Sequence, residues 1–201
     1  QAFFFFFLRK MTEEGVTFRS HINGDEHLFT PEKVVEIQRV LGSDILMPLD
    51  VCLPYPSEHQ AVKEALELTS RWAKRTQVHM KNTQALYGFE QTFFPIIQGG
   101  MYEDLRKQSA EQLLELNQPG YAIGGVSVGE PDEERFRMIE ASAKLIPDNK
   151  PRYLMGVGTP ADLKFAISQG IDMFDCVLPT RLARHGSAFT WDDKLNIKNE
   201  K

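Results

Sequence analysis

The sequence predicts an α/β fold in which short parallel strands alternate with helices. Five short apolar runs are separated by segments of helical periodicity, and short loops join them in the order β-α-β-α-β-α-β-α-β. The runs are almost continuously apolar, as expected of parallel strands that are buried on both faces. This alternation is typical of a closed barrel or of an open doubly wound sheet.

The residues that follow the five runs favour the barrel. In a barrel the carboxyl ends of all strands share one face, where active sites form, whereas an open sheet gathers ligands only at a switch point. A complete TIM (β/α)8 barrel takes about 250 residues, so we predict that residues 1–201 form one partial barrel domain and that part of the barrel lies outside them. The polar and glycine residues at the ends of the runs are Asp50, Gln98, Gly124-Gly125, Gly156 and Asp175.

The first predicted elements form a hairpin. Residues 16–22 alternate between apolar and polar side chains, as in a half-buried strand. Asn23-Gly24 is a strong turn signal, and residues 27–29 are predicted to return as the partner strand.

A helix is predicted directly after the hairpin. Thr30 supplies an N-cap hydroxyl, Pro31 fits the first helical position, and an acid follows in the first turn. Lys33 stands where a reciprocal capping box needs Glu or Gln. The helix should run to about Leu41 and end at Gly42.

The later elements continue the alternation, and Trp72 is predicted to be a core residue of the longest helix. They are a strand at 44–50, a helix capped by Ser57 and reaching Met80, a strand at 93–98, a helix at 102–116, a strand at 120–126, a helix at 131–145, a strand at 152–157, a helix from Thr159-Pro160 to Gly170, and a strand at 171–177.

Composition narrows the class of protein. Hydrophobic residues make up 42% and charged residues 25%, which excludes wholesale disorder. Acidic residues outnumber basic ones by 28 to 23, so a general polycation that coats nucleic acid is excluded, although a local basic patch is not. Cys52 and Cys176 are too few for a disulfide framework or a Cys-rich zinc site, and a reduced cytoplasm fits best.

No apolar run reaches the roughly 18 residues that a membrane-spanning helix needs, and we expect no membrane association. The run from Phe3 to Leu8 lacks the basic start of a signal peptide. Since the chain begins with Gln1, we expect a fragment cut inside a folded domain.

Asp175 is the first candidate for chemistry. Phe174, Cys176 and Val177 flank it at a strand end, so its carboxylate should be partly desolvated. Such a group can attack an electron-poor carbon and form a covalent intermediate. The alternative, a carboxylate that caps the following loop, is equally compatible with the pattern.

Asp50 is the second candidate. Pro54 and Pro56 stiffen the loop that follows it. A carboxylate accepts two hydrogen bonds side by side, which suits the pair of N–H groups on a purine edge. The alternative is an Asp that braces the loop.

Two glycine-rich turns and a basic stretch complete the candidates. Gln98-Gly99-Gly100 and residues 124–130 let the backbone approach a flat ligand, although either is also compatible with a simple tight turn. Neither fits a nucleotide phosphate loop, and the five histidines lack metal-binding spacing. The basic residues suit phosphate contact or a solvated loop; they are Arg181, Arg184, His185, Lys194, Lys198 and Lys201.

Taken together, five motifs in this order closely resemble the queuine tRNA-ribosyltransferase family, also called tRNA-guanine transglycosylase. The resemblance covers nearly the whole chain, and five long motifs in register are specific. The motifs are Asp50 with Pro54-Tyr55-Pro56, Ile97-Gln98-Gly99-Gly100, Tyr121-Ala122-Ile123-Gly124-Gly125 with Gly129-Glu130, Tyr153-Leu154-Met155-Gly156-Val157-Gly158, and Asp172-Met173-Phe174-Asp175-Cys176-Val177-Leu178-Pro179-Thr180-Arg181.

The resemblance implies a TIM barrel and a transferase of the bacterial type. Such enzymes exchange guanine at wobble position 34 of tRNAs with GUN anticodons for the queuosine precursor preQ1. The exchange is a double displacement without ATP, and the implied covalent intermediate joins Asp175 to ribose C1′. The implied partners are tRNA, preQ1 or guanine, and a second copy in a homodimer.

The resemblance also assigns roles to residues of this sequence. It implies that Asp175 is the nucleophile and that Asp50 reads the purine edge. It places Arg181, Arg184 and Gly156 near the RNA, and Cys52 and Val128 match the bacterial pattern, in which valine favours preQ1 over the larger queuine. The remaining residues implied to bind the base are Gln98 and Gly125 at its carbonyl, Val126 through its backbone, and Met155 as an apolar wall.

Three features depart from the family pattern. Gln1 matches the last residue of a Ser-Gly-Gly-Phe-Gln motif, so the Asp that acts as general acid/base before that motif is not in this chain. Zinc is implied for full-length members, but its three Cys and one His would follow Lys201, and we expect no metal site within residues 1–201. Val51 stands where bacterial members usually have Glu.

Two alternatives to an active transferase stay open: a non-catalytic tRNA-binding homologue, and an inactive fragment of the family. The retained Asp175 argues against the first, because a retired subunit has no need of its nucleophile. An open barrel with exposed strand edges would melt early, which distinguishes the second.

Overall fold

The computed structural model describes residues 9–190 and 193–197. Gln1, the apolar run from Phe3 to Leu8, and Lys198 and Lys201 of the basic stretch lie outside the described residues. In the described part, no helix is both long enough and apolar enough to cross a bilayer.

The chain opens with a three-stranded antiparallel sheet and a helix. The hairpin prediction is confirmed: β2 pairs with β3 around the turn at residues 20–25, with Phe18 opposite His27. The predicted helix start is also confirmed, since the Thr30 hydroxyl accepts the N–H of Lys33 and Gly42 ends the helix in the left-handed conformation. These elements are β1 (Arg9–Met11), β2 (Val16–Arg19), β3 (Glu26–Phe29) and α1 (Pro31–Leu41).

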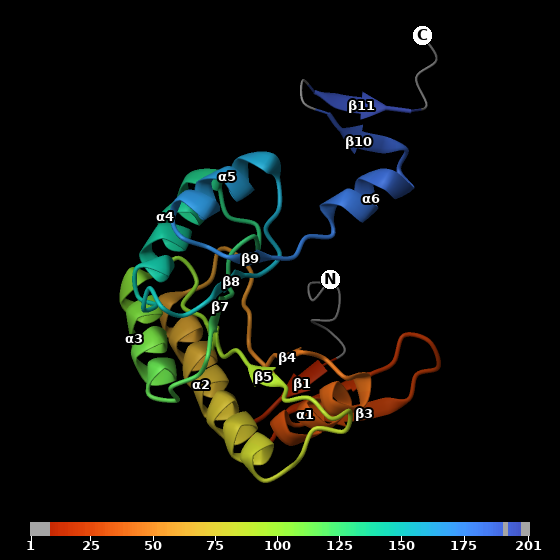
Figure 1. Cartoon of the computed structure of the whole chain (residues 1–201), viewed down its shortest axis with the longest axis vertical. Helices are drawn as coiled ribbons and strands as arrows, with labels where there is room; N and C mark the ends of the chain where they lie inside the picture. Colours follow the sequence, from red (N-terminus) through yellow and green to blue (C-terminus); the bar gives the residue numbers. More distant parts are fainter. Residues whose placement is uncertain (1–8, 191–192, 198–201) are drawn as a thin grey trace.

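The parallel strands predicted from the apolar runs are present but shorter, and a helix follows most of them. Helices α2 to α5 form the outer layer of a crescent, and the strands line its inner side (Figure 1). The elements are β4 (Ile45–Leu46), α2 (His59–Lys81), β5 (Thr92–Phe93), β6 (Ile96–Ile97), α3 (Glu103–Leu114), β7 (Tyr121–Ile123), α4 (Asp132–Ala143), β8 (Arg152–Leu154), α5 (Pro160–Ser168) and β9 (Met173–Phe174).

The strand predicted at 93–98 is two strands. Residues 92–93 pair with β4, and residues 96–97 begin a separate parallel sheet in the order β6-β7-β8-β9. Pro95 stands between them, and proline has no N–H to continue the ladder. The described parallel strands therefore form two sheets that do not close into a barrel, and the predicted partial barrel stays a prediction.

The prediction that Ser57 caps the long helix is wrong. The helix begins at His59, Glu58 occupies the cap position without a side-chain bond, and the Ser57 hydroxyl donates to the carbonyl of Pro54 at 2.6 Å. The start of α5 has more than was predicted, because Thr159 and Asp162 form a reciprocal capping box.

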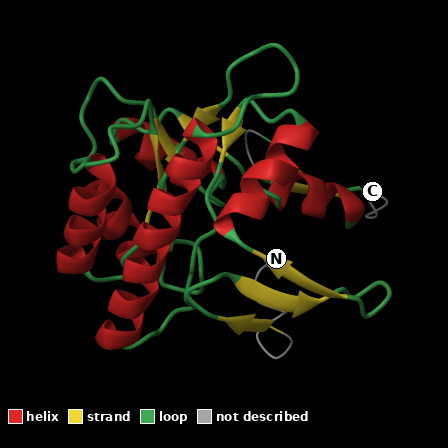
Figure 2. Cartoon of the chain, turned by 90° about the horizontal axis from the view of Figure 1, so that it is seen from below, coloured by secondary structure: helices red, strands yellow, loops and turns green. Residues whose placement is uncertain are grey.

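The main core lies between the four-stranded sheet and the outer helices. Ile97, Ile123 and Leu154 of the strands pack with Met138 and Ile139 of α4, all fully or almost fully buried. Trp72 is fully buried, as predicted, in a second cluster under α2. Figure 2 shows the β1–β3 sheet apart from the helical layer.

The last elements were not predicted. Helix α6 (Leu178–Arg184) is followed by an antiparallel hairpin of β10 (Ser187–Phe189) and β11 (Lys194–Asn196). We call α6 and this hairpin the arm, because they project away from the crescent (Figure 1).

Candidate functional site

The carboxyl ends of β6, β7, β8 and β9 form one edge, which we call the strand-end edge. Parallel pairing places Ile97 beside Ile123 and Leu154 beside Phe174, so the residues that follow each strand emerge in a row. The row consists of Gln98, Gly124-Gly125, Met155-Gly156 and Asp175. The sequence prediction that these residues share one edge is confirmed.

Asp50 joins this edge through Gln98. The Gln98 side-chain amide donates to the Asp50 carboxylate at 2.6 Å, and Gln98 itself is only 3% exposed. The N–H of Val51 donates to the hydroxyl of Thr69 on α2, which fixes the loop that carries Asp50. Burial raises the pKa of Asp50, and the bond from Gln98 partly offsets that rise.

In the two glycine turns, residues 98–100 and 124–126, Gly99, Gly124 and Gly125 are packed too closely for a side chain. A Cβ on Gly125 would lie 2.4 Å from the Gln98 amide oxygen, and one on Gly99 would lie 2.6 Å from the backbone nitrogen of Arg106. Gly125 also has φ +65°, which favours glycine. The turns therefore bring bare backbone against the Gln98 amide.

Arg106 lies beneath both glycine turns, and sequence reasoning missed it. Its guanidinium, on α3, is fully buried and donates to the carbonyls of Gly100, Gly124 and Gly125 and to the hydroxyl of Ser142. Burial lowers its pKa to about 10. In the sequence Arg106 is one of several charged residues on a predicted helix, so no local pattern predicts that it is buried.

Glu130 holds the end of the second turn. Its carboxylate accepts the N–H groups of Ser127 and, at 2.7 Å, of Val128. The carbonyl of Val128 in turn accepts the N–H of Tyr55 at 3.2 Å, so the loop after Asp50 and the turn after β7 are linked. Sequence reasoning quoted Glu130 in a motif but gave it no role.

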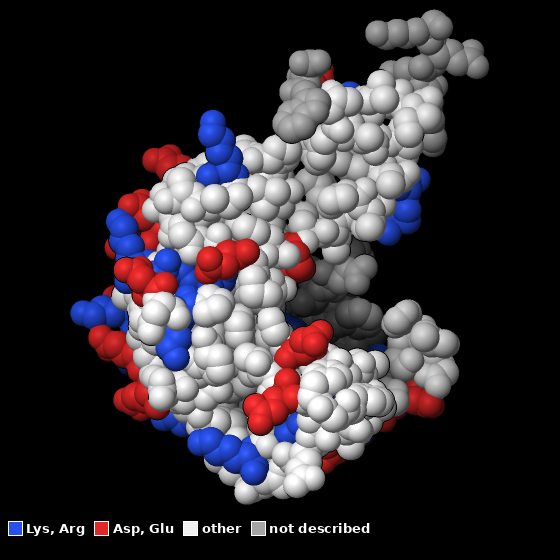
Figure 3. Space-filling view, in the orientation of Figure 1, with Lys and Arg blue, Asp and Glu red and all other residues white. Residues whose placement is uncertain are grey.

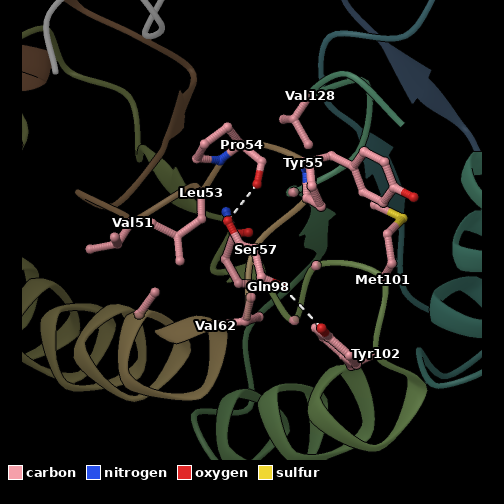
Figure 4. A pocket seen from close by; sticks show the side chains of 15 residues that line it. Val51, Leu53, Pro54, Tyr55, Ser57, Val62, Gln98, Met101, Tyr102 and Val128 are labelled. Atoms are coloured by element: carbon pink, nitrogen blue, oxygen red, sulfur yellow. Dashed lines mark hydrogen bonds between the residues drawn. The ribbon is translucent and has the colours of Figure 1, made fainter. Parts of the chain in front are cut away.

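A cavity of about 200 Å³ opens on one side of Gln98. Figure 4 shows Gln98 among the residues that line the cavity. The Tyr102 hydroxyl donates to the carbonyl of Ser57, and the Ser57 hydroxyl donates to that of Pro54. The volume is below the roughly 300–1,000 Å³ of sites for drug-sized ligands, which suits a small flat molecule. Gln98, Gly125 and Val128 line the cavity, whereas Asp50, Met155 and Asp175 do not.

Cys52 is a neutral thiol next to this site. Burial raises its pKa to about 11, and the nearby Asp50 carboxylate adds to the rise. The backbone N–H of Gly125 acts in the opposite direction. A thiol with this pKa is not a nucleophile at neutral pH.

Asp175 is exposed at the far end of the strand-end edge, so the prediction that its carboxylate is partly desolvated is wrong. Its Oδ1 atom accepts two hydrogen bonds at 2.8 Å, one from the Tyr153 hydroxyl and one from the Gly156 N–H. Burial and then the neighbouring Asp175 carboxylate raise the pKa of Tyr153, so its hydroxyl stays a donor. The role of Tyr153 was missed because it lies inside an apolar run.

A close packing contact fixes the end of β9 against β8. A Cβ on Gly158 would lie 2.3 Å from the Cβ of Cys176, the residue after Asp175. Met155 donates its N–H to the carbonyl of Ile123, which keeps the end of β8 in register with β7. These two contacts therefore fix the backbone that carries Asp175 against the end of β8.

Arg181 and Arg184 lie on the arm, away from the glycine turns. Both are exposed on α6, and no carboxylate of the described residues lies within salt-bridge distance of either. Figure 3 shows mixed charges over the helical outer face and Lys or Arg atoms on the arm. The predicted basic stretch is thus only partly described and stands apart from the other site residues.

The predicted residues fall into three groups. Asp50, Gln98 and Gly125 lie together, with Cys52 and the buried Val126 beside them. The second group, two and three strands from Gln98 along the same edge, is Met155, Gly156 and Asp175. The third group is the arginine pair of the arm.

No metal centre is formed by the described residues. No group of three His, Cys, Asp or Glu side chains in this part of the chain could hold a metal ion. The zinc ligands that the resemblance implies would follow Lys201, and the proposed reaction involves no metal.

Comparison with known proteins agrees with the motifs. The family model of queuine tRNA-ribosyltransferase matches residues 1–201. Proteins of that name are 54% identical over 192 residues in Thermoanaerobacter sp. strain X514, 53% over 199 residues in Caldanaerobacter subterraneus and 54% over 194 residues in Ruminiclostridium cellulolyticum. These matches cover 96–99% of this chain but 50–52% of each relative, so the chain spans about half the length of the curated relatives it matches.

Proposed function

The chain belongs to the queuine tRNA-ribosyltransferase family, and we propose that its protein exchanges guanine at position 34 of tRNA for preQ1. The observation that carries this proposal is the placement of Asp175. It is an exposed carboxylate, held by two donors, on the same strand-end edge as a buried amide–carboxylate pair. One end of the edge suits a flat base, and the other suits attack on a sugar.

The glycine-turn end is suited to reading the base. The Asp50 carboxylate accepts the paired N–H groups of a guanine edge, and the Gln98 amide donates to the base carbonyl. The cavity beside Gln98 is small and lined partly by Val128. In this proposal the valine favours the small substituent of preQ1, and a methyl-scale difference of this kind is worth about 1–3 kcal/mol.

The Asp175 end is suited to covalent catalysis. Because Tyr153 and Gly156 both bind Oδ1, the Oδ2 atom is the one that attacks ribose C1′. The bond from C1′ to guanine N9 breaks, and its electron pair leaves with guanine, which takes up a proton. PreQ1 then loses its N9 proton and attacks C1′, and the Asp175 carboxylate leaves.

Further expectations belong to the same proposal. The two parallel sheets are part of a (β/α)8 barrel, and the general acid/base is the Asp that the resemblance places before Gln1. The Gly156 turn, Arg181 and Arg184 contact the tRNA backbone. The protein is a cytoplasmic homodimer, which size-exclusion chromatography with light scattering would test.

The deciding experiment traps the covalent intermediate. The protein that contains this chain is incubated with a GUN-anticodon tRNA and 9-deazaguanine or preQ1, then run on a denaturing gel. We expect a shifted protein–RNA band that Asp175→Asn abolishes. Asp172→Asn is the matched control, because Asp172 lies three residues earlier and only accepts the backbone N–H of Arg152.

Two outcomes would overturn the proposal. The first is a wild-type protein that forms no band and exchanges no base, and the second is a band that persists in Asp175→Asn. Binding of tRNA without exchange would instead identify a non-catalytic member of the family.

A further inference from the structure

The guanidinium of Arg106 is the most extensively bonded buried group beneath the strand-end edge. Its Nε donates to the carbonyl of Gly100 at 2.8 Å, and both terminal nitrogens donate to that of Gly124 at 3.1 and 3.2 Å. A further bond reaches the carbonyl of Gly125 at 3.1 Å, and another the hydroxyl of Ser142 at 3.1 Å. Four acceptors from three segments thus converge on one planar cation.

These bonds fix which way two peptide groups face. A trans peptide points its C=O and its N–H in opposite directions, and among the described residues the single cis bond is Tyr55-Pro56. Because the carbonyl of Gly124 points at Arg106, the N–H of Gly125 points away from it. By the same geometry, the carbonyl of Gly125 also points at Arg106, so the N–H of Val126 points away from Arg106.

The N–H of Gly125 turns to the side of Gln98 and Cys52. The N–H of Gly125 lies near enough to the Cys52 thiol to lower the pKa of that group. The Gln98 amide oxygen lies where a Cβ of Gly125 would be. The left-handed Gly125, with φ +65°, is the conformation in which successive N–H groups converge on one acceptor.

We propose that Arg106 is a positioning residue, which turns the N–H groups of Gly125 and Val126 toward the carbonyl oxygen of the bound purine. The inference rests on the proposed function, since it assumes that a purine binds beside Gln98. When guanine leaves with the N9 electron pair, negative charge spreads onto its carbonyl oxygen. Preorganised N–H donors stabilise such charge, and a buried cation behind them polarises both peptides further.

The test compares guanine with 2-aminopurine, which lacks both the carbonyl oxygen and the N1–H beside it. Because the N1–H difference is the same in wild type and variant, a change in the preference between the two ligands reports on the carbonyl oxygen. In the protein that contains this chain, we expect Arg106→Lys and Arg106→Met to weaken guanine binding about tenfold or more, as expected for a lost hydrogen bond. Binding of 2-aminopurine should change by less than about twofold, so the preference for guanine, which is the dissociation constant of 2-aminopurine divided by that of guanine, should fall. Calorimetry measures both.

Arg39→Lys is the matched control for stability. Arg39 is also a buried arginine that donates to backbone carbonyls, those of Met80 and Thr83, but it lies between α1 and the end of α2. A merely structural role for Arg106 predicts that both lysine variants lower Tm and that neither changes the ligand ratio.

A milder variant covers the case in which the Arg106 variants do not fold. Ser142→Ala removes the one side-chain acceptor of the guanidinium and keeps the charge. It should reduce the preference for guanine by about two- to fivefold, in line with the loss of one buried hydrogen bond.

An unchanged guanine to 2-aminopurine ratio in a folded variant would overturn the inference and leave the proposed function standing. A wild-type protein that exchanges no base and binds neither ligand would instead overturn the proposed function. A lowered ratio in the Arg106 variants with an unchanged ratio in Arg39→Lys supports the positioning role.

Discussion

The two ends of the strand-end edge are built in opposite ways. At the β6–β7 end, Gln98, Arg106 and Glu130 are buried, and each is bonded to backbone or to a second side chain. At the β9 end, Asp175 is exposed and relies on two donors to one of its oxygens. The same sheet thus carries a rigid, desolvated region and an open one.

On the proposed function, this contrast suits the part of the substrate that each end would bind. A site rejects the wrong small base because that base leaves polar groups of the site without a hydrogen-bond partner. The penalty is large only where water cannot replace the missing partner. A ribose inside a folded RNA can be reached only by a group that stands at the surface. Five predictions test the contrast.

Asp50→Asn should have the largest effect, since it removes the charged acceptor at the buried end. The loss of two charge-assisted hydrogen bonds should weaken guanine or preQ1 binding about 100-fold or more. Calorimetry measures the affinity. Binding within about threefold of wild type would contradict the assigned role of Asp50.

The same variant should be more stable than wild type at neutral pH. Burial raises the pKa of Asp50, so the folded state holds its proton more tightly than the unfolded state does. That contribution to stability is present at low pH and is lost as the pH rises through the raised pKa. Thermal melts should show a gain in Tm at pH 7 that shrinks toward pH 4.

Base affinity should also depend on pH at the buried end. Only the ionised Asp50 accepts the two N–H groups of the base, so binding should weaken as the pH falls through the raised pKa. Well below that pKa the loss approaches about tenfold per pH unit. Titrations from pH 8 to pH 4 check this, and Asp50→Asn should be flat over the same range if the assignment holds.

Tyr153→Phe should have a smaller effect, because it changes the open end. The variant keeps the ring and removes one donor to Oδ1 of Asp175. Adduct formation should slow about three- to tenfold, with base affinity unchanged, as water replaces the lost donor. Rapid-quench gels give the rate. Tyr121→Phe, at the opposite end of the neighbouring β7, should leave it unchanged.

Substitution of Arg181 and Arg184 by Gln should have the smallest effect. Their loss should weaken tRNA binding by a few-fold and reduce the slope of log K against log salt by about 0.7–0.9 per lost phosphate contact. Filter binding at several salt concentrations measures both. Lys107→Gln with Lys144→Gln, at paired lysines of the outer layer, is the control that should leave the slope unchanged.

The sequence is most informative where local chemistry decides the structure. The start of α1 at Thr30-Pro31 and its end at Gly42 need only caps and a left-handed glycine, and both were predicted. The alternation of apolar runs likewise predicted the parallel order of the strands. Pro95 divided one predicted strand, because a missing N–H outweighs an apolar pattern.

The parts that were not predicted depend on packing between distant segments. Arg106 looks like a solvated charge until α3 is placed against the turns of β6 and β7. Tyr153 gains its role only when β8 and β9 pair and bring Asp175 within reach. Ser57 does not cap the helix: its hydroxyl donates to the carbonyl of Pro54 and accepts no N–H of the first helical turn.

The turn between β8 and α5 connects the Asp175 carboxylate to the helices of the outer layer. Its first residues supply the Gly156 N–H that holds the Asp175 carboxylate, and its last residue, Thr159, shares a capping box with Asp162. Asp162 also accepts from Arg135 of α4 at 2.8 Å. On the proposed mechanism, a substitution of Arg135 on the convex face would loosen this turn. The Asp175 carboxylate on the concave face would then lose its alignment for attack.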